Sequence, residues 1–163
     1  MINILDFASF STRKSNQSKL GILLTFLVLI FTSSLVQSFH TYAQSDPFGS
    51  SNTCSKLSVN GITASGADPL HPPSRAIDQN VNTRWSNLGL GSWIQIDLGQ
   101  ENVVCNVAIN WHRGNERVNS FVISMSKDGN TFANVYSGKS DGTSLTEQNY
   151  NLQSKAGRFI RVM

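Results

Sequence analysis

Alternation of apolar and polar residues with a period of two is the feature that most limits what this chain can fold into. It is clearest in the segment VVCNVAINW, one face of which carries Val103, Cys105, Val107, Ile109 and Trp111. A period of two is that of a β-strand with one buried face, so these side chains are expected to point into a core. The segments at 93–98 and 121–126 repeat the pattern.

A hairpin signal follows the segment at 121–126. Asp128-Gly129 comes almost directly after it, and Asp-Gly between alternating segments is a strong short-range indication of a hairpin. Further strands are expected at 131–136, 146–152 and 158–163, and no stretch after the first 44 residues repeats at helical spacing. Short, closely spaced strands with Gly, Asp, Asn and Ser at the joints predict an all-β, antiparallel sandwich or barrel.

The first 44 residues have the composition of an export signal. Basic residues precede the apolar run at 20–31, and Thr41 and Ala43 occupy positions −3 and −1 of a cleavage site after Ala43 or Gln44. An N-terminal membrane anchor is the alternative, because the run extended to Val36 reaches the lower limit for a bilayer-spanning helix. Either reading predicts a secreted or cell-surface protein, with a polar tether at 45–56 and one domain at 57–163.

Charge and cysteine content narrow the class further. Residues 45–163 contain ten Lys and Arg against nine Asp and Glu, a net charge of +1. They contain no stripe of basic residues, so nucleic-acid binding is not predicted. In an exported chain, the pair Cys54 and Cys105 predicts a disulfide. It would close a loop of roughly fifty residues, worth about 3–4 kcal/mol in the chain-entropy model. Two thiols without nearby histidines are too few for a zinc site.

The stretch SRAIDQNVNTRWS places Asp78, Asn80 and Asn82 at every second position, as in the first half of an EF-hand loop. An EF-hand is excluded, because Thr83 occupies the position of the required glycine and Gly89 that of the glutamate. Two readings stay open at this point: a non-helical calcium loop, or an Asx turn that leads to Trp85.

The segment NWHRGNERVNSF is the second concentration of polar groups. Trp111 is in phase with the buried face, whereas Arg113, Asn115 and Arg117 lie in a loop where planar guanidinium and amide groups suit bidentate hydrogen bonding to hydroxyls or carboxylates. The alternative is a surface salt bridge of Glu116 with either arginine, worth at most about 1 kcal/mol. No nucleophile, zinc-protease or P-loop motif occurs, so the chain is not expected to be an enzyme.

Four segments in order resemble the F5/8 type C (discoidin) domain, and in particular its family 32 carbohydrate-binding modules. They are SRAIDQNVNTRWSN, GSWIQIDLG, VAINWHRGNERVNSFVISMSKDGNTF and RFIRV. The resemblance covers residues 57–163 and implies a galactose-binding-like jelly-roll β-sandwich. Because the given chain stops within RFIRVM, a sandwich lacking its C-terminal strand is expected.

The resemblance also implies a structural calcium ion at the polar stretch. The matching donors are the backbone carbonyl of Arg75, the Asp78 carboxylate, the Asn80 carbonyl and Thr83, while Gln79 replaces a common glycine. In the family a further ligand is a glutamate of the last strand, which would follow residue 163. The calcium site is therefore expected to be incomplete.

Sugar-binding members of the family use loops at one end of the sandwich. Their histidine after the motif tryptophan is replaced by Ser86, whereas Arg113 matches their arginine. The expected glycan-binding residues are Ser86, Asn87, Arg113, Asn115 and Arg117.

The resulting hypothesis is a non-catalytic extracellular module that binds a glycan or glycoprotein on a cell surface or matrix. One alternative is a protein- or membrane-adhesion domain of the discoidin type, for which Leu88 and Leu90 are the apolar candidates. The other is a truncated structural remnant.

Overall fold

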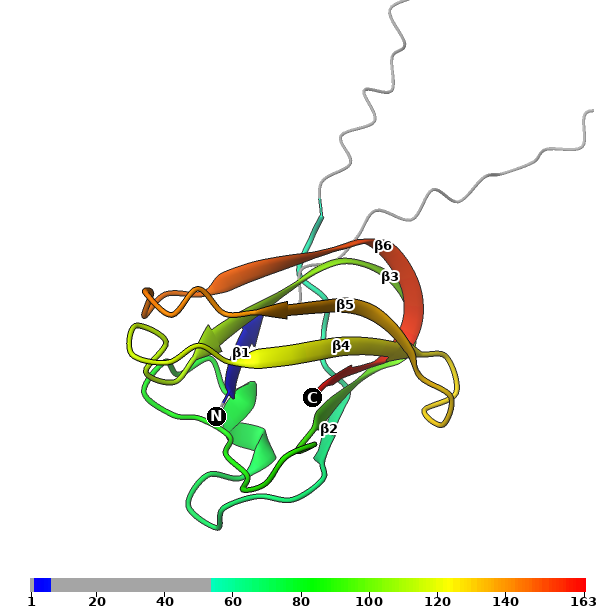
Figure 1. Cartoon of the computed structure of the whole chain (residues 1–163). Coiled ribbons are helices and arrows are strands. Elements are labelled where there is room, and N and C mark those ends of the chain that lie inside the picture. Colours follow the sequence, from blue (N-terminus) through cyan, green and yellow to red (C-terminus); the bar gives the residue numbers. More distant parts are fainter. Residues whose placement is uncertain (1, 7–53) are drawn as a thin grey trace, which may run out of the picture. The chain divides into compact units, whose positions relative to one another are not determined.

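The computed structural model describes residues 2–6 and 54–163. This part of the chain contains six strands: β1 (Ile2–Asp6), β2 (Gly61–Ala64), β3 (Ile94–Trp111), β4 (Ser120–Ser126), β5 (Ala133–Lys139) and β6 (Gln148–Val162). All pair antiparallel, in the order β1-β3-β6-β4-β5 with β2 beside β3 (Figure 1). The only helical turn among the described residues is the 3-10 turn η1 (Pro73–Ala76). The fold is all-β, as the alternation predicted.

Most of the predicted leader and tether lies outside the described residues. The exceptions are β1, which pairs with the end of β3, and the last residues of the tether, from Cys54 onward. No helix in the described part of the chain is long and apolar enough to cross a membrane.

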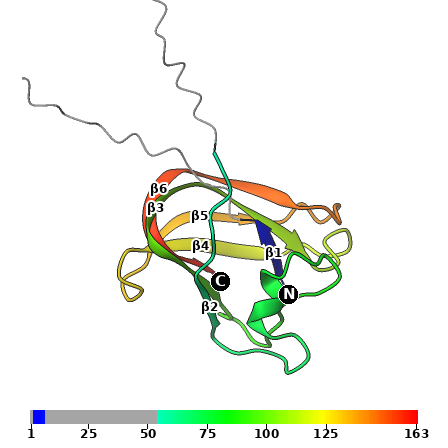
Figure 2. The same ribbon diagram turned by 180° about the vertical axis from the view of Figure 1, so that it is seen from behind.

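The two long strands β3 and β6 run side by side and curve together (Figures 1 and 2). Each was expected as two separate strands. Their pairing is interrupted between Asp97 and Asn102 and again between Val104 and Asn106. Extra residues at such interruptions bend and twist a strand pair. The first half of β3 therefore pairs with β2 and the end of β6, and the second half with β1 and the start of β6.

The core consists of the apolar side chains that alternate along these strands. Ile94, Ile96 and Leu98 of β3 are buried as predicted, as are alternating residues of β4 and β6. Trp85 is 3% exposed and belongs to the same cluster. Such a cluster is the main favourable contribution to folding, at roughly 25 cal/mol per Å² of apolar surface buried.

One part of the inward face was predicted wrongly. Val103 and Cys105 were expected to be buried, but both are partly exposed and Val104 between them is fully buried. The register shift between Val104 and Asn106 is the reason, because an extra residue reverses the phase of the alternation on one side of it. From Val107 to Trp111 the predicted face is correct.

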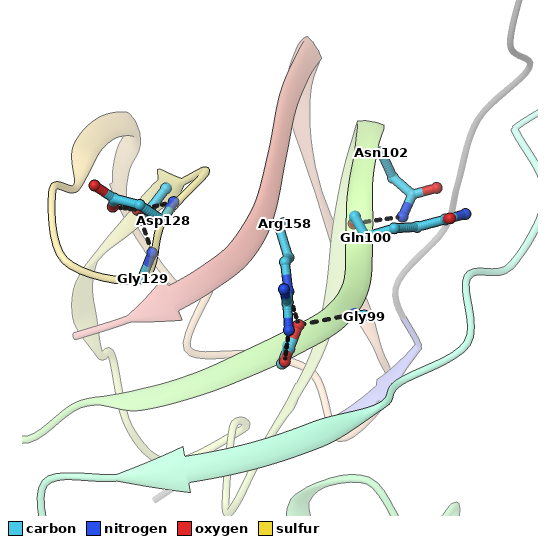
Figure 3. A network of polar contacts seen from close by, with 8 residues as sticks. Gly99, Gln100, Asn102, Asp128, Gly129 and Arg158 are labelled. Atoms are coloured by element: carbon cyan, nitrogen blue, oxygen red, sulfur yellow. Dashed lines mark hydrogen bonds and ion pairs between the residues drawn. The ribbon is translucent and has the colours of Figure 1, made fainter.

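Two polar arrangements secure the strands. Asp97 on β3 accepts two hydrogen bonds from Arg158 on β6, at 2.7 and 2.8 Å, and these bonds lower the pKa of Asp97 to about 2 (Figure 3). In the β4–β5 connection, Asp128 accepts hydrogen bonds from the backbone N–H groups of Asn130 and Thr131. Gly129 there has φ of +79°, so the predicted Asp-Gly hairpin is confirmed, with a loop longer than two residues.

The predicted disulfide is present. Cys54 and Cys105 are bonded, with their Cα atoms 6.4 Å apart, and no free cysteine occurs among the described residues. The bond joins the start of the domain to the irregular middle of β3.

Candidate functional site: an oxygen loop beside a guanidinium groove

The residues Arg75–Thr83, here called the oxygen loop, fold into successive Asx turns. Asp78 Oδ1 accepts a hydrogen bond from the Asn80 N–H, and Asn80 Oδ1 accepts one from the Asn82 N–H, both at 3.0 Å. Such side-chain-to-backbone bonds are the usual way for Asp and Asn to shape a turn. The spacing of two in the sequence therefore produces a repeated turn.

The same loop gathers oxygen atoms around one hydroxyl. Thr83 Oγ1 lies 2.8 and 2.7 Å from the two carboxylate oxygens of Asp78 and 2.9 Å from the Asn80 carbonyl. The Arg75 carbonyl is 3.3 Å away. A hydroxyl has a single proton, so it cannot donate to all four oxygens at once. The other oxygen atoms therefore lie close to the Thr83 oxygen without a proton between them. A bound cation would offset the repulsion between these oxygens.

This donor set suits calcium more than a transition metal. Ca²⁺ takes six to eight oxygen ligands, including carboxylate, carbonyl and hydroxyl groups, whereas zinc sites use Cys and His. The described residues contain no cluster of three or more His, Cys, Asp or Glu, so Asp78 would supply the charge. All four residues expected from the family resemblance contribute to this one cluster of oxygens.

Gln79 occupies a backbone conformation that favours glycine. Its φ is +59°, in the left-handed region. A residue with a Cβ pays about 1–2 kcal/mol there. The glycine that is common at this position in the resembling family would avoid that cost, so the substitution leaves a strained backbone within the oxygen loop.

An open groove of about 440 Å³ lies beside the oxygen loop, here called the guanidinium groove. Its walls are Val81 and Asn82 from the loop, Asn110 and Trp111 at the end of β3, His112, Arg113, Asn115 and Glu116 after it, and Leu145 from the connection before β6. Val81 and Leu145 are each 63% exposed, so the groove presents apolar surface opposite amide and guanidinium groups. Mixed apolar and polar walls are typical of small-ligand sites.

The floor of the groove is held rigidly. The indole N–H of the buried Trp111 donates to the Tyr150 hydroxyl at 2.8 Å, and that hydroxyl donates to Gln148. Burial raises the pKa of Tyr150. Gly114 allows the neighbouring loop to approach, because a Cβ at this position would lie 2.5 Å from the Ser144 carbonyl oxygen. Any larger residue at 114 would displace the loop that carries Arg113 and Asn115.

The electrostatic character of the groove is positive around His112. Burial lowers the pKa of His112, and the nearby charges of Arg84, Arg117 and Arg113 lower it further. Arg113 makes a 3.1 Å ion pair with Glu116, in which both side chains are about half exposed. The Nε of Arg84 is buried and has no hydrogen-bond partner.

The predicted glycan-binding residues fall into two places. Arg113 and Asn115 line the guanidinium groove, and Arg117 acts on His112 electrostatically. Ser86 and Asn87 instead line a separate concavity of about 270 Å³.

Polar groups of Ser86 and Asn87 already have hydrogen-bond partners within the domain. Ser86 is 4% exposed, and its backbone N–H and carbonyl both form backbone hydrogen bonds. The Asn87 amide donates to the hydroxyls of Ser65 and Ser92. The structure therefore does not bring Ser86 and Asn87 together with the arginines in one pocket.

Other groove residues were missed by sequence reasoning. His112 and Leu145 line the groove and were not assigned a role, nor was Arg84, whose charge acts on His112. Val81 and Asn82 were considered only as part of the polar stretch. Arg84 precedes the motif tryptophan and His112 follows the last residue of β3, so proximity to a motif was an available signal for both. Leu145 is distant in sequence from the rest of the groove and carries no such signal.

The family follows from a sequence comparison. The model of the F5/8 type C domain matches residues 61–163, which is more than half of the chain. The chain belongs to the F5/8 type C domain family. No curated protein matches it.

Solved structures place this F5/8 type C domain among carbohydrate-binding modules. The CBM32 of AlyQ in complex with 4,5-unsaturated mannuronic acid is 34% identical, with a TM-score of 0.64, over 66% of this chain and 82% of that one. A pectin-binding carbohydrate-binding module is 26% identical, with a TM-score of 0.62, over 65% of this chain and 78% of that one.

A longer relative shows how such a domain can occur beside an enzyme. Truncated AlyQ, with CBM32 and alginate lyase domains, is 34% identical with a TM-score of 0.63. The match covers 66% of this chain and only 28% of that one. The F5/8 type C domain thus corresponds to one module of that longer chain.

Proposed function

We propose that residues 57–163 form a non-catalytic carbohydrate-binding module that is exported and meets its glycan outside the cell. The observation that carries the proposal is the guanidinium groove, which is lined by Arg113 and Asn115 together with the apolar Val81 and Leu145. Planar guanidinium and amide groups suit hydrogen bonding to the hydroxyls of a sugar, and apolar walls suit its C–H faces. The carbohydrate-binding modules of similar structure support this choice of ligand.

The carboxylates of the groove support a binding role over hydrolysis. Glycoside hydrolysis uses two carboxyl groups on either side of the scissile bond. The groove is lined by the single carboxylate of Glu116, which pairs with Arg113.

A glycan panel tests the proposal. Purified protein is titrated with neutral and acidic oligosaccharides by calorimetry, and its Tm is followed with each. At least one glycan class should bind and raise the Tm, and Arg113→Ala should weaken that binding by about tenfold or more, as expected for loss of a charge-assisted bidentate contact.

A charge-matched control separates the groove from general electrostatics. Lys155 is exposed on β6, opposite Val104 in the middle of β3, so Lys155→Ala removes the same charge away from the groove. It should leave glycan affinity unchanged. A folded protein that responds to no glycan class would contradict the proposal and would favour the structural-remnant hypothesis.

We also propose that the oxygen loop holds a structural Ca²⁺ ion. Arg75, Asp78, Asn80 and Thr83 would supply its oxygens, and the ion would fix the conformation of the loop. With one carboxylate in the set, weak binding is expected. Support comes from the four oxygens around the single Thr83 hydroxyl.

Surface adhesion is a second candidate function, favoured by one observation. Leu88 and Leu90 are fully exposed, and Leu70 is 72% exposed. Exposed leucines on loops can enter a membrane or contact a protein. Sedimentation with anionic liposomes tests it: Leu88→Ser with Leu90→Ser should abolish binding if these residues insert, whereas unchanged sedimentation would exclude insertion at this loop.

A further inference from the structure

The positive charge of the domain is concentrated at the guanidinium groove. Residues 54–163 contain ten Lys and Arg against eight Asp and Glu, a net of +2. Around His112 alone, the three guanidinium groups of Arg84, Arg113 and Arg117 stand against the one carboxylate of Glu116. The excess at this one place equals that of residues 54–163, so the other charges of this segment balance.

The single carboxylate of the groove neutralises little of this charge. Glu116 pairs with Arg113 where both side chains are about half exposed, and exposed ion pairs contribute little to stability. Arg113 can therefore exchange this partner for a ligand anion at small cost. Asp141, behind the floor, is already engaged by the backbone N–H groups of Thr143 and Ser144 and by Gln148.

Arg84 adds an independent indication. Its Nε is buried without a hydrogen-bond partner, and its charge acts on the imidazole of His112, which lines the groove. Arg84 does not itself line the groove, so it acts on a ligand there through its charge. Together with Arg113 and Arg117 it makes a site in which a neutral ligand would leave the positive charge uncompensated.

The other residues that line the groove indicate that the anionic group belongs to a sugar. Val81 and Leu145 offer exposed apolar surface to C–H groups, and the amides of Asn82, Asn110 and Asn115 offer donors and acceptors to hydroxyls. A free phosphate or a simple carboxylic acid would use the guanidinium groups and leave these walls unoccupied.

We propose that the guanidinium groove is selective for an anionic glycan, with a carboxylate or sulfate of the sugar bound by Arg113 in the positive field to which Arg84 and Arg117 contribute. This inference rests on the proposed function and narrows it to one ligand class. Arg113 and the surrounding positive field select the charge, and the apolar and amide walls select the ring. Because guanidinium donors are planar and paired, they bind either oxyanion by two parallel hydrogen bonds.

The test uses acidic and neutral versions of the same sugars. Oligogalacturonate, oligomannuronate and oligoguluronate are each titrated beside their carboxyl-reduced forms, which keep the ring but lose the charge. A sulfated galactan oligosaccharide and its desulfated form test the second oxyanion. The acidic member of at least one pair should bind about tenfold more tightly than its neutral partner, and the pair that shows this identifies carboxylate or sulfate.

Salt and charge-preserving variants complete the experiment. Affinity for the acidic sugar should fall severalfold between 50 and 500 mM NaCl, because screening weakens exposed charge interactions. Arg117→Lys keeps the charge and should retain the preference for acid over neutral sugar, whereas Arg117→Gln should weaken that preference. Lys155→Gln, with the same loss of charge elsewhere, should leave the preference intact.

The failures of the two proposals are distinguishable. Equal or tighter binding of the neutral partners, or binding of other neutral glycans alone, would overturn the anionic preference and leave glycan binding standing. Absence of binding to every sugar, with an unchanged melting curve that shows a folded domain, would overturn the proposed function itself.

Discussion

The oxygen loop and the guanidinium groove are neighbours with opposite chemistry. The loop gathers carboxylate, carbonyl and hydroxyl oxygens around Thr83, whereas His112 in the groove experiences the charges of three guanidinium groups. Val81 and Asn82 belong to both, as residues of the loop and as a wall of the groove. One short segment thus borders a site suited to a cation and a site suited to an anion.

Because the two sites share this segment, calcium binding and glycan binding should be coupled. An ion that holds the oxygen loop would also fix the wall that Val81 and Asn82 present to a glycan. Thermodynamic linkage makes such coupling reciprocal, so glycan should tighten calcium binding by the same factor by which calcium tightens glycan binding. Variants that act on one region and spare the other can separate the two contributions.

Charge reversal in the groove should have the largest effect. Arg113→Glu with Arg117→Glu replaces two attractive charges by two repulsive ones, so affinity for an anionic glycan should fall about a hundredfold or more. Calorimetry measures the affinity. The rise in Tm with calcium should persist, and its loss would mean that the two regions are not separable.

Removal of the Asp78 charge from the oxygen loop should have the second-largest effect. Asp78→Asn keeps an oxygen that can accept the Asn80 N–H but removes the one carboxylate, so calcium should bind about tenfold more weakly or not at all. The measurement is the Tm with calcium and with EDTA. Glycan affinity in EDTA should match that of the unaltered protein, because the groove charges are intact. A calcium-dependent Tm that survives Asp78→Asn would contradict the proposed site.

Titration of His112 should have a smaller effect, confined to the groove. Burial and the charges of Arg84, Arg117 and Arg113 lower its pKa, so the imidazole is neutral at pH 7 and gains its proton at a lower pH than an ordinary histidine. Protonation adds a positive charge that a bound anion favours. Affinity for an acidic sugar should therefore rise severalfold as the pH falls through this pKa.

A matched variant assigns this pH dependence. His112→Gln should remove the rise and leave affinity at pH 7 within a fewfold of the unaltered protein. The carboxyl-reduced sugar should show no such rise with the unaltered protein. A rise of equal size with both sugars would assign the effect to folding rather than to charge.

Gln79→Gly should have the smallest effect. Glycine removes the cost of about 1–2 kcal/mol for a side chain at positive φ, and loses about 0.4–1 kcal/mol through the greater freedom of the unfolded chain. The net expectation is a stabilisation of about 0.5 kcal/mol, measurable as a higher midpoint of urea unfolding. A destabilised variant would show that the Gln79 side chain makes a contribution of its own to the oxygen loop.

The sequence predicted the fold well where alternation was unbroken. The faces of Ile94, Ile96 and Phe121 were correct because each lies in a regular segment with one buried side. The disulfide was predicted from two cysteines and an expected export signal. The inward position of Cys105 was predicted wrongly, because a register shift depends on the pairing of two strands and leaves no mark in the local pattern.

The candidate site was less accessible to sequence reasoning. The oxygen loop is local, so its spacing and the family resemblance together identified the residues that gather around Thr83. The groove is assembled from three separate segments, and Leu145 could not be linked to Arg113 without the fold. Ser86 follows a recognisable motif, but its burial is set by backbone pairing with Asp68 and His71.

The disulfide also determines how the domain would carry mechanical force. Tension applied to the chain ahead of Cys54 passes through the sulfur atoms to Cys105 in β3, rather than along residues 55–104. That bypassed segment contains β2, η1 and the whole oxygen loop. Held by a tether at its N-terminal side, the domain would bear load on its longest paired strands, and the Val81–Asn82 wall of the groove would stay relaxed until the bond was reduced.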